Sequence, residues 1–260
     1  EITRAAVLKA LQALDNHFDS AGAAMRIDHD WANVHGTSIT SYRHVQGYEF
    51  HDNDRVPARR SYIQAYNYAD YGTQEFWLSN RNPGRITWLA GLFAYGNLVD
   101  ANDPRFETGT TVTPAGYREV YGRQQTRSYS VFGQATGSLT DATKLTLGLR
   151  YTTEDLVEDG KYLNAAKQLI QGSPFNSKLS FKPVTWRVAL DHQFTQDVLG
   201  YVSVNHGFKS GGYNLATPDR APFQPELVNA LEIGVKSELM DHRVRLNAAL
   251  FYYDYKDIQV

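Results

Sequence analysis

The 260-residue chain contains no cysteine, which excludes disulfide frameworks, thiol catalysis and cysteine-ligated metal sites. It contains no run of about 18 apolar residues either, so the sequence predicts no membrane-spanning helix. A net charge of only −2 provides no basic field that would favour nucleic acid as a partner. A membrane is not excluded, because a barrel strand crosses a bilayer with about 9–11 residues of alternating polarity.

The first residues lack both the basic start and the apolar core of a signal peptide. The last residues, 256–260, are strand-like and carry no polar tail. We therefore expect an internal piece of a longer protein rather than a complete cytoplasmic one.

Residues 1–22 are expected to be a loop segment with one short amphipathic helix over 4–18. The apolar positions Val7, Leu8, Leu11, Leu14 and Phe18 follow the spacing of a helical stripe. A partner-binding or membrane-surface helix is less favoured, because the polar face is not rich in Lys or Arg.

From residue 23 to 260 apolar residues recur at every second position, which predicts strands. Ten are expected, at 23–32, 36–47, 73–81, 85–97, 127–138, 143–156, 180–194, 198–209, 227–238 and 243–256. Short turns alternate with longer connections, which are expected at about 48–72, 98–126, 157–179 and 210–226. This alternation predicts an antiparallel up-and-down meander with all short turns at one rim, the design of transmembrane β-barrels.

The two faces of each expected strand differ in polarity. Leu145, Leu147, Leu149 and Tyr151 alternate with Lys144, Thr146, Gly148 and Arg150. We expect the apolar face to meet lipid and the other to line a wet lumen, although alternation alone also fits a soluble β-sandwich. Aromatic girdles are expected from Trp186, Tyr252, Tyr253 and Tyr255 near the outer rim and from Phe194 near the inner rim. The exceptions are His192 on the apolar face, and Leu89, Phe93 and Tyr95 on the polar one.

Ordered motifs in the second half of the chain resemble a known family. The sequence YVSVNHGFKSGGYN at 201–214 is followed by FQPELVNALEIGVKSEL and MDHRVRLNAALFYYDYKDIQV. Together they are similar to the barrel of TonB-dependent outer-membrane receptors, and so are the hairpins at 74–97 and 128–154. The family-signature strand end consists of Phe208, Lys209, Ser210, Gly211, Gly212 and Asn214, hereafter the signature segment.

This resemblance implies a transmembrane barrel of about 22 strands behind a plug domain that TonB engages. Residues 23–260 would then be an incomplete slice of about ten strands, a curved open meander without plug. The implied function is active uptake of ferric siderophores or a similar scarce nutrient across the bacterial outer membrane, with the TonB complex, the ligand and membrane lipid as partners. Alternatives are a passive porin-like channel and a soluble β-sandwich carbohydrate-binding protein.

No pattern for bond chemistry is found, so we expect no enzyme, catalytic residue or cofactor. Lys209 and Ser210 precede the glycines, whereas a phosphate-binding loop needs them after. The run 51–54 (HDND) suits a solvated turn better than a cation site, and no HExxH pair indicates zinc. Four charges on the lumen-facing side are weak ligand or plug candidates, otherwise members of salt-bridge ladders between strands: Arg150, Glu232, Lys236 and Arg245.

Overall fold

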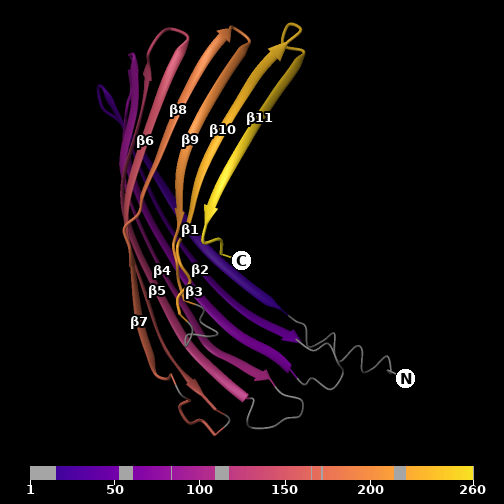
Figure 1. Cartoon of the computed structure of the whole chain (residues 1–260). Helices are drawn as coiled ribbons and strands as arrows, with labels where there is room; N and C mark the ends of the chain where they lie inside the picture. Colours follow the sequence, from indigo (N-terminus) through magenta and orange to yellow (C-terminus); the bar gives the residue numbers. More distant parts are fainter. Residues whose placement is uncertain are drawn as a thin grey trace.

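The described part of the chain forms one antiparallel sheet of eleven strands (Figure 1). A computed structural model describes residues 16–52, 61–82, 84–108, 117–164, 166–170, 172–213 and 221–259. The strands are β1 (His17–Asp30), β2 (Val34–Asp52), β3 (Ser61–Asn80), β4 (Ile86–Thr108), β5 (Tyr117–Ser138), β6 (Thr143–Leu163), β7 (Phe175–Phe181), β8 (Val184–Thr195), β9 (Val198–Lys209), β10 (Glu226–Leu239) and β11 (Val244–Lys256).

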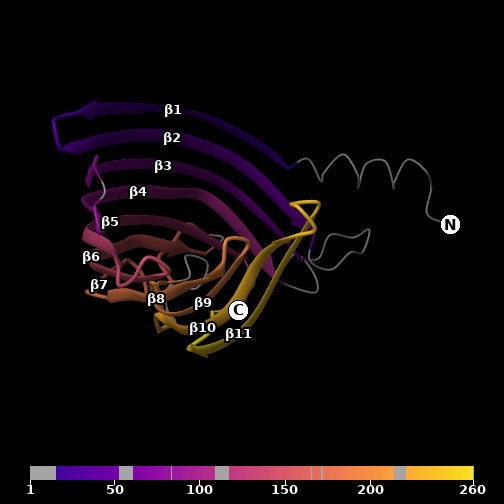
Figure 2. The same cartoon turned by 90° about the horizontal axis from the view of Figure 1, so that it is seen from above.

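Strands that follow one another in the sequence are neighbours in the sheet, except that β7 and β8 do not pair with each other and both pair with β6. The short turns 31–33, 81–85, 139–142, 196–197 and 240–243 all lie at one end of the strands, at the top of Figure 1. Seen from above, the sheet curves through an open arc from β1 to β11 (Figure 2). The predicted all-β, up-and-down meander and its incomplete closure are therefore confirmed.

Both ends of the sheet are edges: among the described strands, β1 pairs only with β2 and β11 only with β10. None of the described segments is a helix long and apolar enough to cross a membrane. Over the residues that the structure describes, the sheet is a single layer without an opposing sheet (Figure 2). This arrangement excludes the two-sheet sandwich, which needs a continuous core between its layers.

Two expected strand limits were wrong. β1 begins at His17, so residues 17–22 belong to the sheet rather than to a loop segment, and the expected helix cannot reach Phe18. The rest of that helix lies outside the described residues. The expected strand 180–194 is divided into β7 and β8 around Pro183, because proline has no backbone N–H for the ladder.

Three of the four long connections are shorter than expected, since β2 to β6 extend far beyond the predicted strands, whereas the connection from 210 to 225 is close to the expected one. β2 continues to Asp52 and β3 starts at Ser61, for example. These extensions mix apolar and polar residues on both faces, with Val120 and Tyr162 buried among polar neighbours, so no regular alternation marks them in the sequence. The expected turn at 51–54 begins within the end of β2, and its residues 53–54 lie outside the described residues.

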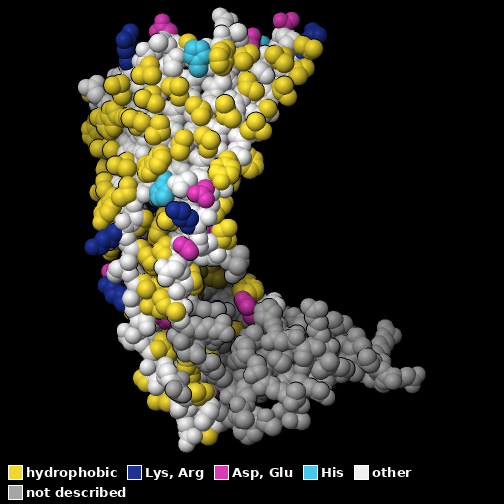
Figure 3. Space-filling model, viewed as in Figure 1, with side chains coloured by type: hydrophobic (Ala, Val, Ile, Leu, Met, Phe, Trp, Pro, Cys, Tyr) yellow, Lys and Arg dark blue, Asp and Glu magenta, His cyan; other side chains and the backbone are white. Residues whose placement is uncertain are grey.

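The convex and concave faces carry different side chains, as predicted. Figure 3 shows apolar side chains over the convex face next to the short turns. On β6 the convex Leu149 is 60% exposed, whereas the concave Thr146 is 8% exposed. The apolar band on this strand runs from Leu145 to Tyr151, and the polar extension follows it.

The aromatic residues partly follow the predicted girdles. Register places Tyr151, Trp186 and Tyr252 on the convex face, opposite Val131, Leu149 and Leu231. The expectation for Tyr253 and Tyr255 was wrong, because neighbours along a strand point to opposite faces. They lie on the concave face with Phe251, whose ring stacks on that of Tyr253 at 5.0 Å.

Candidate functional site

The signature segment continues β9 past the apolar band and packs against residues 223–225. A Cβ at Gly211 would lie 2.4 Å from the carbonyl oxygen of Phe223, closer than any real contact. Gly212 and Phe223 exchange two backbone hydrogen bonds of 3.2 and 2.9 Å. The two glycines are therefore required by the close approach of two backbone segments.

The same segment connects three parts of the sheet. The Ser210 hydroxyl donates to the Glu154 carboxylate of β6. The Gln259 side chain, just beyond β11, donates to the Ser210 carbonyl at 2.9 Å, and its backbone N–H donates to Glu226 at 3.1 Å. Hydrogen bonds from Ser210 and Gln259 thus hold this end of β9 against β6 and against the end of β11.

The remaining residues of the segment contribute weaker contacts. The Phe208 ring lies 6.0 Å from that of Phe181 in β7, and the Lys209 ammonium lies 4.0 Å from the Glu226 carboxylate. Asn214 lies outside the described residues. Sequence patterns identified the segment but missed Glu154 and Gln259, whose contribution depends on strand pairing.

Arg150 lies on the concave face among aromatic rings. Its guanidinium stands 5.0 Å from the Phe93 ring centroid and 5.5 Å from that of Phe132, and it donates to the Ser130 hydroxyl at 2.9 Å. This cation–π arrangement explains Phe93, one of the exceptions on the polar side of β4. Arg150 is thus committed to contacts within the sheet.

Glu232 and Lys236 share a partner, Tyr201 of the neighbouring strand β9. The Tyr201 hydroxyl donates to Glu232 at 2.6 Å, and the Lys236 ammonium lies 5.5 Å from the centre of its ring. A Cβ at Gly234 would lie 2.6 Å from that ring, so the glycine makes room for Tyr201. Glu232 and Lys236 thus each contact Tyr201, in place of the salt bridge between strands that the sequence led us to expect.

Arg245 pairs with Glu238 directly across the β10–β11 hairpin, with 3.0 Å between its Nε and the carboxylate. His242 Nδ1 lies 2.6 Å from the other Glu238 oxygen. This cluster adjoins the short turn 240–243, whereas the signature segment lies at the opposite end of the strands. The four charged candidates therefore do not form one site.

A second polar network, missed by sequence reasoning, occupies the concave face of β1 and β2. Asp28 accepts hydrogen bonds from Arg26 Nε and from the buried Thr37 hydroxyl, both at 2.7 Å. His35 lies between Asp28 and Asp30, at 3.3 and 2.6 Å. The spacing of these residues carries no motif, and only the strand register brings them together.

Glu158 is a buried carboxylate on β6, seven residues beyond the apolar band. It is 1% exposed, and neither oxygen has a hydrogen-bond partner within the described part of the chain. Burial, followed by the charge of Asp159, raises the pKa of Glu158 to about 7. Among all the described residues, no group of three or more His, Asp or Glu side chains is arranged so that it could hold a metal ion.

The family model for the TonB-dependent receptor-like β-barrel matches residues 4–260, almost the whole chain. The chain belongs to this family. Its members are receptors rather than enzymes. The expected resemblance is therefore confirmed over the whole sheet.

Solved structures share the fold at low sequence identity. The ferric yersiniabactin uptake receptor FyuA from Yersinia pestis is 18% identical, with a TM-score of 0.76 over 94% of this chain. The siderophore receptor PiuA from Acinetobacter baumannii is 14% identical, with a TM-score of 0.72 over 91%. The copper transporter OprC is 11% identical, with a TM-score of 0.69 over 93%. The chain spans only 37%, 40% and 40% of these three proteins.

Proposed function

We propose that the chain is the barrel portion of an active uptake receptor in the bacterial outer membrane. The family match over residues 4–260 carries this proposal. The apolar convex band beside the short turns supports a position in lipid, with those turns on the periplasmic side. Energy would come from the TonB complex through a plug domain elsewhere in the full-length protein.

The proposed ligand is a ferric siderophore or a similar scarce nutrient. FyuA takes up ferric yersiniabactin and PiuA is a siderophore receptor, whereas OprC is a copper transporter, so a metal or its chelate is the shared theme. The signature segment and, separately, the concave charges Arg150, Glu232, Lys236 and Arg245, which do not form one site, are the candidates for contact with ligand or plug. Their present partners suit a positioning role better than direct ligand contact.

A passive porin-like channel is the second candidate, because it would share the convex band and the short turns. Energy dependence separates the two. We would express the full-length gene in an iron-starved strain that lacks its own siderophore receptors, and measure uptake of radioactive iron from a panel of ferric siderophores. Saturable uptake that stops on addition of a protonophore is expected; uptake that continues undiminished would instead support a channel.

Gly211→Ala tests whether the signature segment contributes to ligand binding. The added Cβ must displace the backbone near Phe223, so we expect weaker ligand binding by a receptor that still migrates as a folded, heat-modifiable band. Gly137→Ala is the matched control, because a Cβ there meets no described atom within 4 Å. Equal ligand affinity of both variants would remove the segment from the proposed site.

A further inference from the structure

A group of polar side chains interrupts the apolar convex face on β2 and β3. Its members, hereafter the polar patch, are Ser38, Thr40, Tyr42, His44, Asp70 and Gln74. Strand register shows which face they share, because Ser38 lies opposite Phe76, and Phe76 lies opposite Leu92. Leu92 and Val131 continue this row to Tyr151, a residue of the convex face. The other members alternate with Ser38 or Phe76 along the two strands and therefore point the same way.

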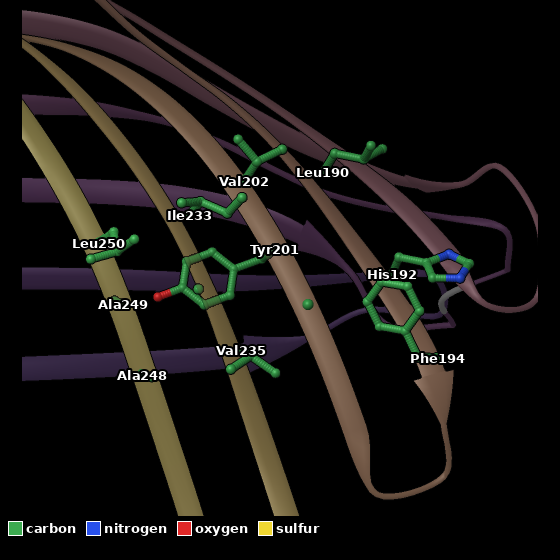
Figure 4. A pocket seen from close by; sticks show the side chains of 12 residues that line it. Leu190, His192, Phe194, Tyr201, Val202, Ile233, Val235, Ala248, Ala249 and Leu250 are labelled. Atoms are coloured by element: carbon green, nitrogen blue, oxygen red, sulfur yellow. The ribbon is translucent and has the colours of Figure 1, made fainter.

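The polar patch lies within the apolar band rather than beyond it. The row of Thr40 and Gln74 continues to Met25 on β1 and to Ala94 on β4, so apolar strands flank it on both sides. Figure 4 shows the same face of β8 to β11, where a row across four strands is entirely apolar: Leu190, Val202, Ile233 and Leu250. The patch is thus a local departure from the composition of the convex face.

Three members of the patch form a chain of hydrogen bonds in the middle of the band. The Thr40 hydroxyl donates to Gln74 Oε1 at 2.5 Å, and Gln74 Nε2 donates to Ser38 Oγ at 3.0 Å. Among the described residues Ser38 only accepts in this chain, so its own hydrogen remains for an outside group. Thr40 and Gln74 are exposed despite these bonds. The network fixes the side chains but leaves hydroxyl and amide atoms at the surface.

The patch continues toward the outer end of the two strands. The Tyr42 hydroxyl donates to Asp70 Oδ1 at 2.5 Å, and His44 Nδ1 lies 2.8 Å from the same oxygen. Gly72 lies opposite Tyr42, and no described atom lies within 4 Å of the position that its Cβ would take. Polar groups therefore surround an open position at which another backbone can approach closely.

These features fit a protein partner within the bilayer better than lipid. Hydrocarbon chains offer no hydrogen-bond partner to a hydroxyl or an amide. Protein surfaces associate in lipid through close packing at small residues and through hydrogen bonds between polar side chains. The patch offers both, with Gly72 as the small residue and with Ser38, Thr40 and Gln74 as the polar ones.

The chemistry of the patch makes it complementary to itself. Hydroxyl and amide groups donate and accept hydrogen bonds alike, and Asp70 and His44 contribute one acid and one base. A two-fold axis along the membrane normal would bring the same surface of a second copy against it, which is the geometry of a closed dimer. A partner of a single charge would leave one member of that acid–base pair unmatched.

We propose that the polar patch is the contact surface of a receptor dimer in the plane of the outer membrane. The proposal rests on the outer-membrane location in the proposed function, but not on which nutrient is imported. Each copy contributes β2 and β3, and the two patches meet across the axis.

The first test measures association of the full-length receptor in vesicles of phosphatidylethanolamine and phosphatidylglycerol. Energy transfer between donor-labelled and acceptor-labelled receptors, followed as the protein-to-lipid ratio is lowered, gives the dissociation constant of the dimer. Gln74→Leu removes polar contacts from both copies and should raise this constant about tenfold. Gln134→Leu is the matched control, because Gln134 is also exposed but lies on the concave face, opposite Gly148.

The second test locates the contact by cross-linking. A cysteine introduced as Gly72→Cys should give a covalent dimer with a bismaleimide in the same vesicles. Gly137→Cys is the control, because Gly137 is equally open and lies on the convex face opposite Leu145, outside the patch. Heat-modifiable migration verifies that every variant is folded before it is compared.

Weaker association of Gln74→Leu alone, together with cross-linking at position 72 alone, is the expected result. A wild-type receptor that is monomeric at every protein-to-lipid ratio would overturn the proposal, as would equal association of both leucine variants. A different outer-membrane protein that copurifies with the wild type and is lost from Gln74→Leu would make that protein the occupant instead. The proposed function is tested separately: a dimer that imports no ferric siderophore refutes only that function, and a monomer that imports normally refutes only the dimer.

Discussion

The two faces of the sheet are built from the same strands but hold their side chains differently. On the convex face, Leu149 and its neighbours are exposed and make few polar contacts. On the concave face, Tyr201 bonds Glu232 and Arg150 lies over aromatic rings. The convex face is proposed to lie against lipid, whereas side chains on the concave face are held by contacts with one another. The same substitution should therefore lower the stability of the barrel by different amounts on the two faces.

The largest effect is expected from a charge on the convex face. Leu149→Arg would place a guanidinium near the middle of the apolar band, where such changes cost about 2–4 kcal/mol of barrel stability. Denaturant unfolding of the full-length receptor from lipid vesicles measures this loss. Ala249→Arg on the concave face is the control, because its side chain is exposed and lies one strand from Glu232.

Equal destabilisation by the two arginine variants would contradict the assignment of the faces. Greater destabilisation by Ala249→Arg would reverse it, with the concave face toward lipid. Both comparisons require that the two variants fold. Heat-modifiable migration on a gel verifies this before the unfolding measurement begins.

Glu158 offers an intermediate effect that depends on pH. Its pKa is raised from 4.5 to about 7, so the folded state holds a proton that the unfolded state releases. Stability is thus highest below pH 4.5 and falls as the pH rises toward 7. Glu158→Gln removes the ionisable group and should stabilise the outer half of β6 at pH 8, on the order of 1 kcal/mol.

Hydrogen exchange of β6 peptides, compared between Glu158→Gln and wild type at the same pH, measures this effect. Slower exchange is expected in the variant at pH 8, with no difference at pH 4. Asp159→Asn, an exposed neighbour on the convex face, should change exchange far less. A variant that protects β6 equally at both pH values would show that titration of Glu158 is not the cause.

Sequence alternation predicted the strands and their faces wherever one face is apolar, as in β6 between Leu145 and Tyr151. It failed in the outer extensions, where apolar and polar residues are mixed on both faces and the period of two is lost. The girdle prediction grouped Tyr252 with Tyr253, although alternation itself places adjacent residues of a strand on opposite faces.

The candidate site could be predicted only as a motif. The glycines at 211 and 212 are visible in the sequence, but the close approach of the Phe223 backbone, which requires them, is not. The bond from Ser210 to Glu154 joins residues 56 positions apart. Such contacts depend on which strands pair and in which register, and neither is encoded in local spacing.

The smallest effect is expected from a polar pair on the concave face itself. Arg245 is bonded to Glu238, but its side chain is 72% exposed, so water and salt screen the pair and its contribution should be close to zero. Arg245→Ala should leave the unfolding midpoint of the full-length receptor unchanged at physiological salt, as should Glu238→Gln, and the double variant should behave like either single one. If Arg245→Ala lowered the stability of the receptor as much as Leu149→Arg does, the plug or other strands of the full-length barrel would have to bury this pair. The reason is that breaking an ion pair is so costly only when the pair is shielded from water.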